Sequence, residues 1–366
     1  MNKSFLVIIL FVLLTSFFSF NAIAMLRAAS IAAEEALVIP KASVRRIFAR
    51  GFSSIRESID FTVHLRSDFR DFWWNDDFLL LMQRRLNLVE VKTALDVGCG
   101  MGHWTRRIYP LLARDVEITG VDIDERFLEE ARVMTDEAPL DLNPGKIKFQ
   151  KTDAYEIPFG DETFDLVTCQ TLLMHLKDPE RTIAEMLRVL KPGGRLLLAE
   201  PNNYANIVRA NTAQEELSIE ERIDIVRLYA MVEEGKKRLG MGNMGVCSYL
   251  SKMLKSLGCE GVEVYRNDKV FYLSVPYTRE QEVLATHLRE FTENDYFYIF
   301  PPESARMFFE AVSTDESLYT RLIETSRKLN AIYKRQIDTK SLEGTFGGEM
   351  LVTVGRKYTT YESERV

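Results

Sequence analysis

The sequence predicts an α/β fold in which a largely parallel sheet is covered by helices. Between residues 91 and 200, short runs rich in Val, Ile and Leu alternate with helix-length segments. That alternation is typical of βαβ units with right-handed crossovers. A glycine-rich turn directly follows the first of these runs. The chain has 366 residues, 46% of them hydrophobic, which suffices for one large domain or two modest ones.

The apolar run 91–97 ends in glycines, as a buried parallel strand does. Helices are expected wherever longer segments separate the strands, and Lys191-Pro192-Gly193-Gly194 stops the last of them. The expected strands after the first are 117–121, 146–150, 164–169 and 195–200, and the helices are 103–112, 125–134 and 179–190.

After residue 200 the alternation weakens. Helices are expected at 215–240 and 249–257, strands at 262–265, 270–275 and 350–355, and mostly helix at 278–340. The last helical stretch is too long for a hairpin, so we interpret it as an insertion that could cover a substrate pocket. The expected regions are a signal-like or anchor segment 1–24, N-terminal helices 25–89, a core of 90–276 and 345–358, and the insertion 277–344.

The N-terminus allows three interpretations. Lys3, the apolar run from Phe5 and the Ala22-Ile23-Ala24 triplet are typical of a secretory signal peptide. Residues 5–24 are also long enough for an uncleaved membrane anchor, and the basic residues after them favour a cytoplasmic catalytic domain over a secreted one. Alternatively, translation begins at Met25. Residues 28–50 are expected to form an amphipathic helix outside the core.

The turn Asp96-Val97-Gly98-Cys99-Gly100-Met101-Gly102 has the chemistry of a nucleotide-binding loop. Its glycines let the backbone approach a ligand at the carboxyl end of the sheet. The spacing is not the G-x-G-x-x-G of dinucleotide sites. Asp96 would also repel a pyrophosphate, whereas it tolerates a cationic amino-acid group. A nicotinamide-dependent oxidoreductase is therefore disfavoured.

Two further acids follow successive strands. Asp122 closes the second expected strand, where a carboxylate can accept hydrogen bonds from both ribose hydroxyls. Asp153 follows the third strand, where it can take an adenine amino group. Asp124 is expected instead to cap the next helix. The three acids indicate a site for an adenosine that carries a cationic tail.

These segments, together with Phe164-Asp165-Leu166-Val167 and Leu190-Lys-Pro-Gly-Gly-Arg-Leu196, resemble class I S-adenosylmethionine-dependent methyltransferases. The resemblance spans about residues 90–202, and the subgroup most resembled acts on small molecules. It implies a Rossmann-like, doubly wound sheet of seven mostly parallel strands, and S-adenosylmethionine as cofactor. The cofactor-binding residues would be Asp96, Gly98, Cys99, Gly100, Asp122, Ile123, Asp153, Ala154 and Gln170.

An Asn or Asp followed by Pro-Pro-Tyr, the signature of amino-methylating members, is absent after the fourth strand. No residue is a firm catalytic candidate. His175 can serve as a base near neutral pH or simply pack. Trp73, Trp74, Tyr204, Tyr296 and Tyr298 are candidates for substrate contact, although core packing explains the aromatic clusters equally well.

Composition limits the partners. The net charge of −7 argues against a nucleic-acid binder. The four cysteines lack metal or disulfide spacing, so we expect free, packed thiols and no metal site. The predicted function is methyl transfer to a small molecule, with membrane association through 5–24 left open. The alternative is a non-catalytic S-adenosylmethionine-binding module or sensor at a membrane.

Overall fold

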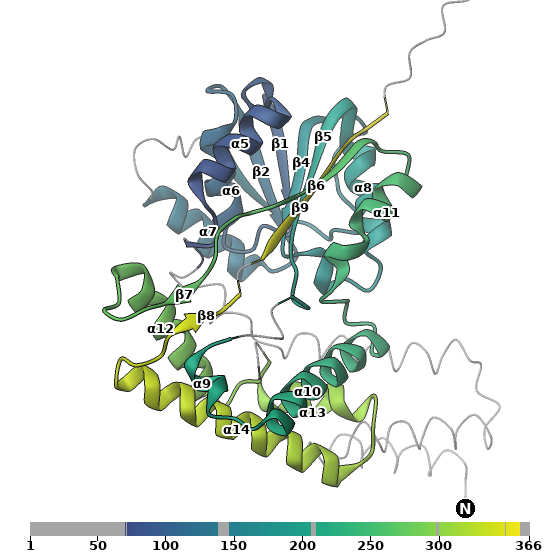
Figure 1. Cartoon of the computed structure of the whole chain (residues 1–366). Coiled ribbons are helices and arrows are strands. Elements are labelled where there is room, and N and C mark those ends of the chain that lie inside the picture. The colour runs from purple at the N-terminus through teal and green to yellow at the C-terminus, as the bar shows by residue number, and fades with distance from the viewer. Residues whose placement is uncertain are drawn as a thin grey trace, which may run out of the picture. The chain divides into compact units, whose positions relative to one another are not determined.

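A seven-stranded sheet forms the centre of the computed structural model, with the strand order β3-β2-β1-β4-β5-β9-β6 (Figure 1). Strand β9 runs antiparallel to both of its neighbours, and the other strands run parallel. The strands are β1 (Thr93–Val97), β2 (Glu117–Asp122), β3 (Ile147–Lys151), β4 (Phe164–Gln170), β5 (Leu190–Pro201), β6 (Glu260–Arg266) and β9 (Met350–Arg356). The predicted Rossmann-like sheet is confirmed.

The structure describes residues 70, 72–137, 146–205, 210–297, 300–347 and 349–358. All of these residues belong to one unit, Phe61–Val366. The N-terminal segment 5–24 and the helix expected at 28–50 lie outside them. Within the described ranges, no helix has the length and apolar character needed to cross a bilayer.

Strand β1 lies between β2 and β4. The chain therefore builds one half of the sheet, β2 and β3, on one side of β1 and then crosses to the other side for β4 and β5. Because crossovers are right-handed, the helices of the two halves cover opposite faces, and the reversal opens a crevice at the carboxyl ends of β1 and β4. The helices that accompany these strands are α5 (Asp76–Leu86), α6 (His103–Ile108), α7 (Glu125–Asp136), α8 (Pro179–Val189) and α11 (Leu250–Ser256).

The face under α5 and α6 carries one large core. Trp74 and Phe78 pack with Trp104 and Ile108 of α6 in a cluster that also contains apolar residues of several strands. The Trp74 and Trp104 rings stack at 4.7 Å between centroids. This packing attaches the N-terminal aromatic segment to the sheet.

A helical region gathers at one end of the sheet (Figure 1). It is made from the connection between β5 and β6 and from the connection between β6 and β9. Its elements are α9 (Thr212–Glu215), α10 (Ile219–Arg238), α12 (Arg279–Glu293), α13 (Pro302–Glu310), α14 (Glu316–Asp338), and the paired strands β7 (Tyr272–Leu273) and β8 (Gly344–Thr345). A second core that includes Leu217, Leu284 and Leu329 holds the two connections together.

Most expected elements form within a few residues of the expected limits. The helix expected at 103–112 ends at Ile108 and continues as a 3-10 turn, Tyr109–Leu111, which contains Pro110. The strand expected at 270–275 shortens to β7, which pairs with β8 in a separate ribbon. The four cysteines are free thiols, three of them buried, as expected.

Candidate functional site

The glycine loop after β1 is hydrogen-bonded to the end of β2. The N–H groups of Gly98 and Cys99 both donate to the Val121 carbonyl, at 2.7 and 3.0 Å. Gly98 has φ 70°, and a Cβ at this position would lie 2.6 Å from Leu172 Cδ1. A side chain would therefore be strained and crowded here, which explains the glycine. The Gly100 N–H donates to Asp122 Oδ2 at 2.9 Å, so the loop and the acid on β2 are positioned together.

Asp96 is fully buried at the point where β1 meets the loop. Thr105 donates to its Oδ2 at 2.5 Å, while Oδ1 has no hydrogen-bond partner. Burial raises the pKa of Asp96 to about 7, against the lowering effect of the Thr105 hydrogen bond. A buried carboxylate oxygen without a donor is costly, so it fits a ligand that brings a cationic donor.

Asp122 ends β2, and Ile123 follows it at the carboxyl end of the sheet. Asp122 Oδ1 accepts from the Asp124 N–H at 3.0 Å, and burial raises the pKa of Asp122. Ile123 is 62% exposed, which is high for an apolar residue beside a buried strand. An exposed apolar face next to a carboxylate fits the face of a nucleoside. Asp124 caps α7 by accepting from the Arg126 N–H, as expected.

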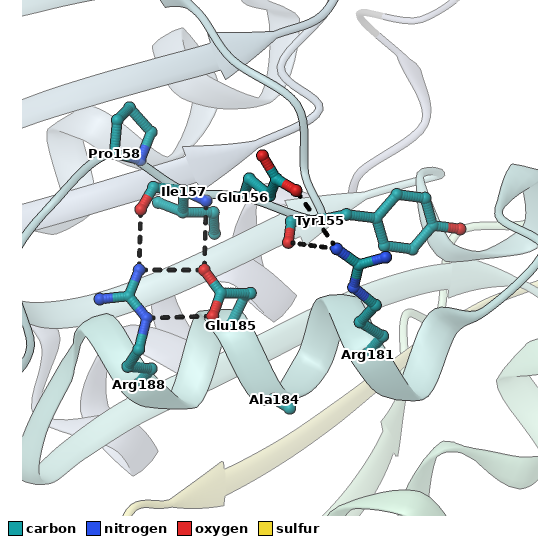
Figure 2. Close-up of a pocket in the computed structure, with 8 residues that line it drawn as sticks. All are labelled: Tyr155, Glu156, Ile157, Pro158, Arg181, Ala184, Glu185 and Arg188. Atoms are coloured by element: carbon teal, nitrogen blue, oxygen red, sulfur yellow. Dashed lines mark hydrogen bonds and ion pairs between the residues drawn. The ribbon is translucent and has the colours of Figure 1, made fainter.

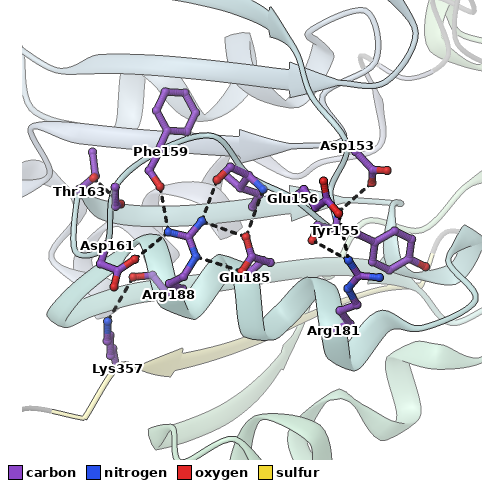
Figure 3. A network of polar contacts seen from close by, with 12 residues as sticks. Asp153, Tyr155, Glu156, Phe159, Asp161, Thr163, Arg181, Glu185, Arg188 and Lys357 are labelled. Atoms are coloured by element: carbon purple, nitrogen blue, oxygen red, sulfur yellow. Dashed lines mark hydrogen bonds and ion pairs between the residues drawn. The ribbon is translucent and has the colours of Figure 1, made fainter.

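Asp153 lies exposed at the start of the loop that follows β3, and Ala154 comes next. The Tyr155 N–H donates to Asp153 Oδ1 at 2.9 Å. Behind this loop, a groove of about 650 Å³ lies between residues Tyr155–Pro158 and α8 (Figure 2). The groove is occupied by structural contacts, because Arg181, Glu185 and Arg188 of α8 all bond to the loop (Figure 3).

Gln170 ends β4 and is 4% exposed. Its Oε1 accepts from Trp74 Nε1 at 3.4 Å, and its Nε2 has no partner. Thr171 follows with φ 54°, a left-handed conformation that is rare for a β-branched residue. Its N–H donates to the Ala199 carbonyl at 2.9 Å. The turn after β4 is thus held in a strained conformation at the crevice.

The other sequence candidates occupy different surroundings. Trp73 is half-buried, and its carbonyl accepts from Asn267 Nδ2 at 2.7 Å. His175 lies in the 3-10 turn Leu173–His175 after β4. Tyr204 is 49% exposed just after β5. Tyr296 packs against Phe291 within the helical region. Tyr298 lies outside the described residues.

Sequence reasoning missed a set of buried polar groups at the ends of β4 and β5. Glu200 is fully buried, and burial raises its pKa to about 8. Glu233 and Lys236 on α10 are 3% and 2% exposed. Glu200 has a weak signal in the sequence, since an acid closes an otherwise apolar run. Glu233 and Lys236 have none, because charges on a long helix are normally solvated.

The arrangement suits S-adenosylmethionine. The unpartnered Asp96 Oδ1 lies where a ligand ammonium would compensate it, and Gln170 Nε2 remains a buried, unused donor. Asp122 and Asp153 follow adjacent parallel strands, so they can bind two parts of one nucleoside. The carboxylates provide no phosphate-binding chemistry at this loop.

Comparison with known proteins agrees with this geometry. Residues 95–198 match the family described as a methyltransferase domain. The chain is 38% identical over 106 residues to the 27-O-demethylrifamycin SV methyltransferase of Amycolatopsis mediterranei, which covers 29% of this chain and 37% of that enzyme. It is 30% identical over 149 residues to the demethylmenaquinone methyltransferase of a Geobacillus species, covering 41% of this chain and 57% of that enzyme.

These matches reach only part of each protein, and the chain spans about half or less of the curated relatives' length. Among solved structures, phosphoethanolamine N-methyltransferase 2 of Haemonchus contortus overlaps at a TM-score of 0.42 and 17% identity. That overlap covers 78% of this chain and 54% of that one, and it carries no information on substrate.

Proposed function

We propose that this chain, which contains a class I S-adenosylmethionine-dependent methyltransferase domain, transfers a methyl group to a small-molecule acceptor. The observation that carries the proposal is the grouping of Asp96, Asp122 and Asp153 at the carboxyl ends of three adjacent parallel strands. The curated relatives, whose names include a rifamycin-type and a menaquinone-type methyltransferase, support a small acceptor.

Each residue of the site has a specific role in this proposal. Asp96 accepts the ammonium of the methionine part through its unpartnered Oδ1. Asp122 accepts the ribose hydroxyls, Ile123 covers the nucleoside face, and Asp153 with Ala154 borders the adenine. Gln170 lies on the sulfonium side. When bound, S-adenosylmethionine supplies an electrophilic methyl group, and the protein mainly aligns the acceptor with it.

Calorimetry with S-adenosylmethionine on the full chain tests the cofactor assignment. Asp122→Ala removes two charge-assisted hydrogen-bond acceptors, each worth about 1.5–3 kcal/mol, so affinity is expected to fall by at least about a hundredfold. Asp124→Ala is the matched control, because Asp124 caps α7 and pairs with Arg126 nearby. It should reduce stability by about 1 kcal/mol with affinity nearly unchanged.

Failure of the unaltered chain to bind S-adenosylmethionine, or undiminished binding by Asp122→Ala, would refute the assignment. Turnover is measured separately, by following isotopically labelled methyl groups into a metabolite extract. Formation of S-adenosylhomocysteine together with a labelled product is expected. Binding without turnover would favour a sensor over an enzyme.

A further inference from the structure

Helix α10 carries two charged side chains that are almost completely shielded from solvent. Glu233 is 3% exposed and Lys236 is 2% exposed. Glu200, at the end of β5, is a third buried charge near them, since Lys236 lowers the pKa of both carboxyls. Charged residues are rarely buried to this extent without a specific partner. Glu200, Glu233 and Lys236 together form what we call the α10 charge cluster.

The α10 charge cluster holds the turn that follows Gln170. The N–H groups of Leu172 and Leu173 donate to Glu200 Oε1 at 2.9 and 2.6 Å. Lys236 Nζ donates to the Met174 carbonyl at 2.9 Å. The inserted helix is therefore docked on the segment directly beside the proposed sulfonium position.

A second segment, residues 241–246, also packs against the turn after β4. A Cβ at Gly242 would lie 2.2 Å from the Met174 carbonyl oxygen, so the two backbones are in direct contact. Asn203 Nδ2 donates to the Met244 carbonyl at 2.9 Å, and the Met244 N–H bonds to Glu233. Glu233 is thus bonded to a segment that contacts both the turn after β4 and Asn203, just after β5.

Two carboxylate oxygens in this setting have no hydrogen-bond partner. Glu233 Oε1 is buried and accepts no hydrogen bond, and the same holds for Glu200 Oε2. Burial raises the pKa of Glu233 to about 7, while Lys236 lowers it. Buried polar atoms without partners are uncommon in native proteins, and they concentrate at functional sites. A ligand that donates a proton or hydrogen bond would satisfy Oε1.

Aromatic rings cluster near this oxygen. Tyr204 is about half exposed, and its pKa is raised by partial burial and, to a smaller extent, by the charge of Glu233. The Tyr204 ring meets that of Tyr229 at 6.2 Å, and Tyr229 meets Phe297 at 6.5 Å. Tyr204 is the exposed ring of this group, and an exposed aromatic ring favours flat, apolar ligands.

We propose that the α10 charge cluster is the acceptor site and that Glu233 is the general base that deprotonates an aromatic hydroxyl. This inference rests on the proposed function. Lys236 selects the acceptor, because its ammonium repels a cationic amine and stabilises an oxyanion. The acceptor class is therefore a neutral phenol or naphthol, methylated on oxygen.

The step is balanced without another reactant. The acceptor oxygen forms a bond to the methyl carbon as the carbon–sulfur bond of the donor breaks and leaves its electron pair on sulfur. The hydroxyl proton passes to Glu233 Oε1. A phenol of tyrosine-like acidity, with a pKa of about 10, needs such a base near neutral pH.

The test measures transfer of a tritiated methyl group from S-adenosylmethionine to simple phenols and naphthols, to nitrophenols that are already ionised near neutral pH, and to arylalkylamines, which are cationic at that pH. Glu233→Gln should lower kcat for the weakly acidic phenols by about 10²–10⁴-fold. For the nitrophenols it should lower kcat by less than about tenfold, since no proton needs removal. A purely structural defect would affect both groups equally.

Glu234→Gln is the matched control, because Glu234 is the next residue, is partly exposed and pairs with Arg238. Its rates should equal those of the unaltered chain. Calorimetry on each variant separates this proposal from the cofactor assignment. With cofactor binding intact, the acceptor proposal is refuted by three results: equal losses for phenols and nitrophenols, methylation of amines alone, or no transfer to any hydroxyl compound.

Discussion

Gly98 illustrates how one residue couples backbone conformation to ligand binding. It has φ 70°, and a Cβ there would also crowd Leu172. Gly98→Ala should lower the free energy of unfolding by about 1–2 kcal/mol from the left-handed conformation alone. It should also weaken S-adenosylmethionine binding measurably, since the loop must shift. Chemical denaturation and calorimetry measure the two effects.

Gly258 provides the control for that prediction. It has φ 80°, yet a Cβ added there would meet no atom within 4 Å, and the residue follows α11 away from the glycine loop. Gly258→Ala should show a similar stability loss with unchanged cofactor affinity. If both variants leave affinity unchanged, close approach at Gly98 is not needed for binding.

Single residues differ in how far their sequence reveals them. Asp122 and Asp124 could be assigned to different tasks beforehand, because one ends a strand and the other precedes a helix, and the cap at Asp124 is confirmed. Glu233 could not be singled out. Glu233 bonds to Met244 and the neighbouring Lys236 bonds to Met174, and neither contact can be read from the pattern of α10 itself.

The loop after β3 is held in place largely by one side chain, that of Arg188. Arg188 donates to the carbonyls of Ile157 at 2.7 Å and Phe159 at 2.9 Å, and it bonds to Glu185 and Asp161 (Figure 3). Ile157 returns a hydrogen bond from its N–H to Glu185 at 3.2 Å. This network fixes the loop that presents Asp153 and Ala154.

Arg188→Met retains much of the apolar stem but removes all of these donors. We expect faster amide exchange at residues 155–160 and weaker S-adenosylmethionine binding, by roughly tenfold if about 1.4 kcal/mol of ordering is lost. Hydrogen exchange with mass spectrometry and calorimetry measure the two effects. Arg327→Met, which loses an exposed pair with Asp295 on another part of the molecule, serves as control. Unchanged amide exchange at residues 155–160 would show that Arg188 is not needed to order the loop.

At the scale of elements, local patterns were sufficient for the strands and most helices of the sheet. They were insufficient for the helical region, because its helices pair across long sequence separations. For example, Asp224 of α10 bonds to Arg321 of α14, 97 positions away. Amphipathic periodicity shows that a helix has an apolar face, but it does not show which partner covers that face.

For the whole molecule, the alternation of strands and helices together with right-handed crossovers determines most of the sheet topology. The position of β9 between β5 and β6 was not predicted, since the last strand could equally have joined an edge and the resemblance implies only seven mostly parallel strands. The electrostatics follow from the same architecture. The carboxyl ends of β1 and β5 bring acids into a dry interior, where ionised carboxylates are unfavourable.

This burial predicts how stability depends on pH. The pKa values of Asp96 and Glu233 are raised to about 7 and that of Glu200 to about 8, mainly by burial. The folded chain therefore binds protons that the unfolded chain has already released above about pH 4.5. The stability that this contributes is fully present at low pH and is lost as the pH rises through 7 and 8. Buried His287, whose pKa is lowered to about 4, acts in the opposite direction, but mainly below about pH 6.5.

The midpoint of thermal unfolding should consequently fall between about pH 6.5 and pH 8.5, and proton release from His287 in the unfolded chain opposes this fall only near the lower end of that window. Glu233→Gln should reduce this slope, because one of the three titrating carboxyls is removed. Glu117→Gln should leave it unchanged, since Glu117 is exposed and its pKa is lowered by Lys146 and Lys148. Calorimetric scans across the window measure the slope. A flat or rising midpoint would mean that these carboxyls ionise in the folded chain without penalty, which contradicts the dry environment inferred for the acceptor site.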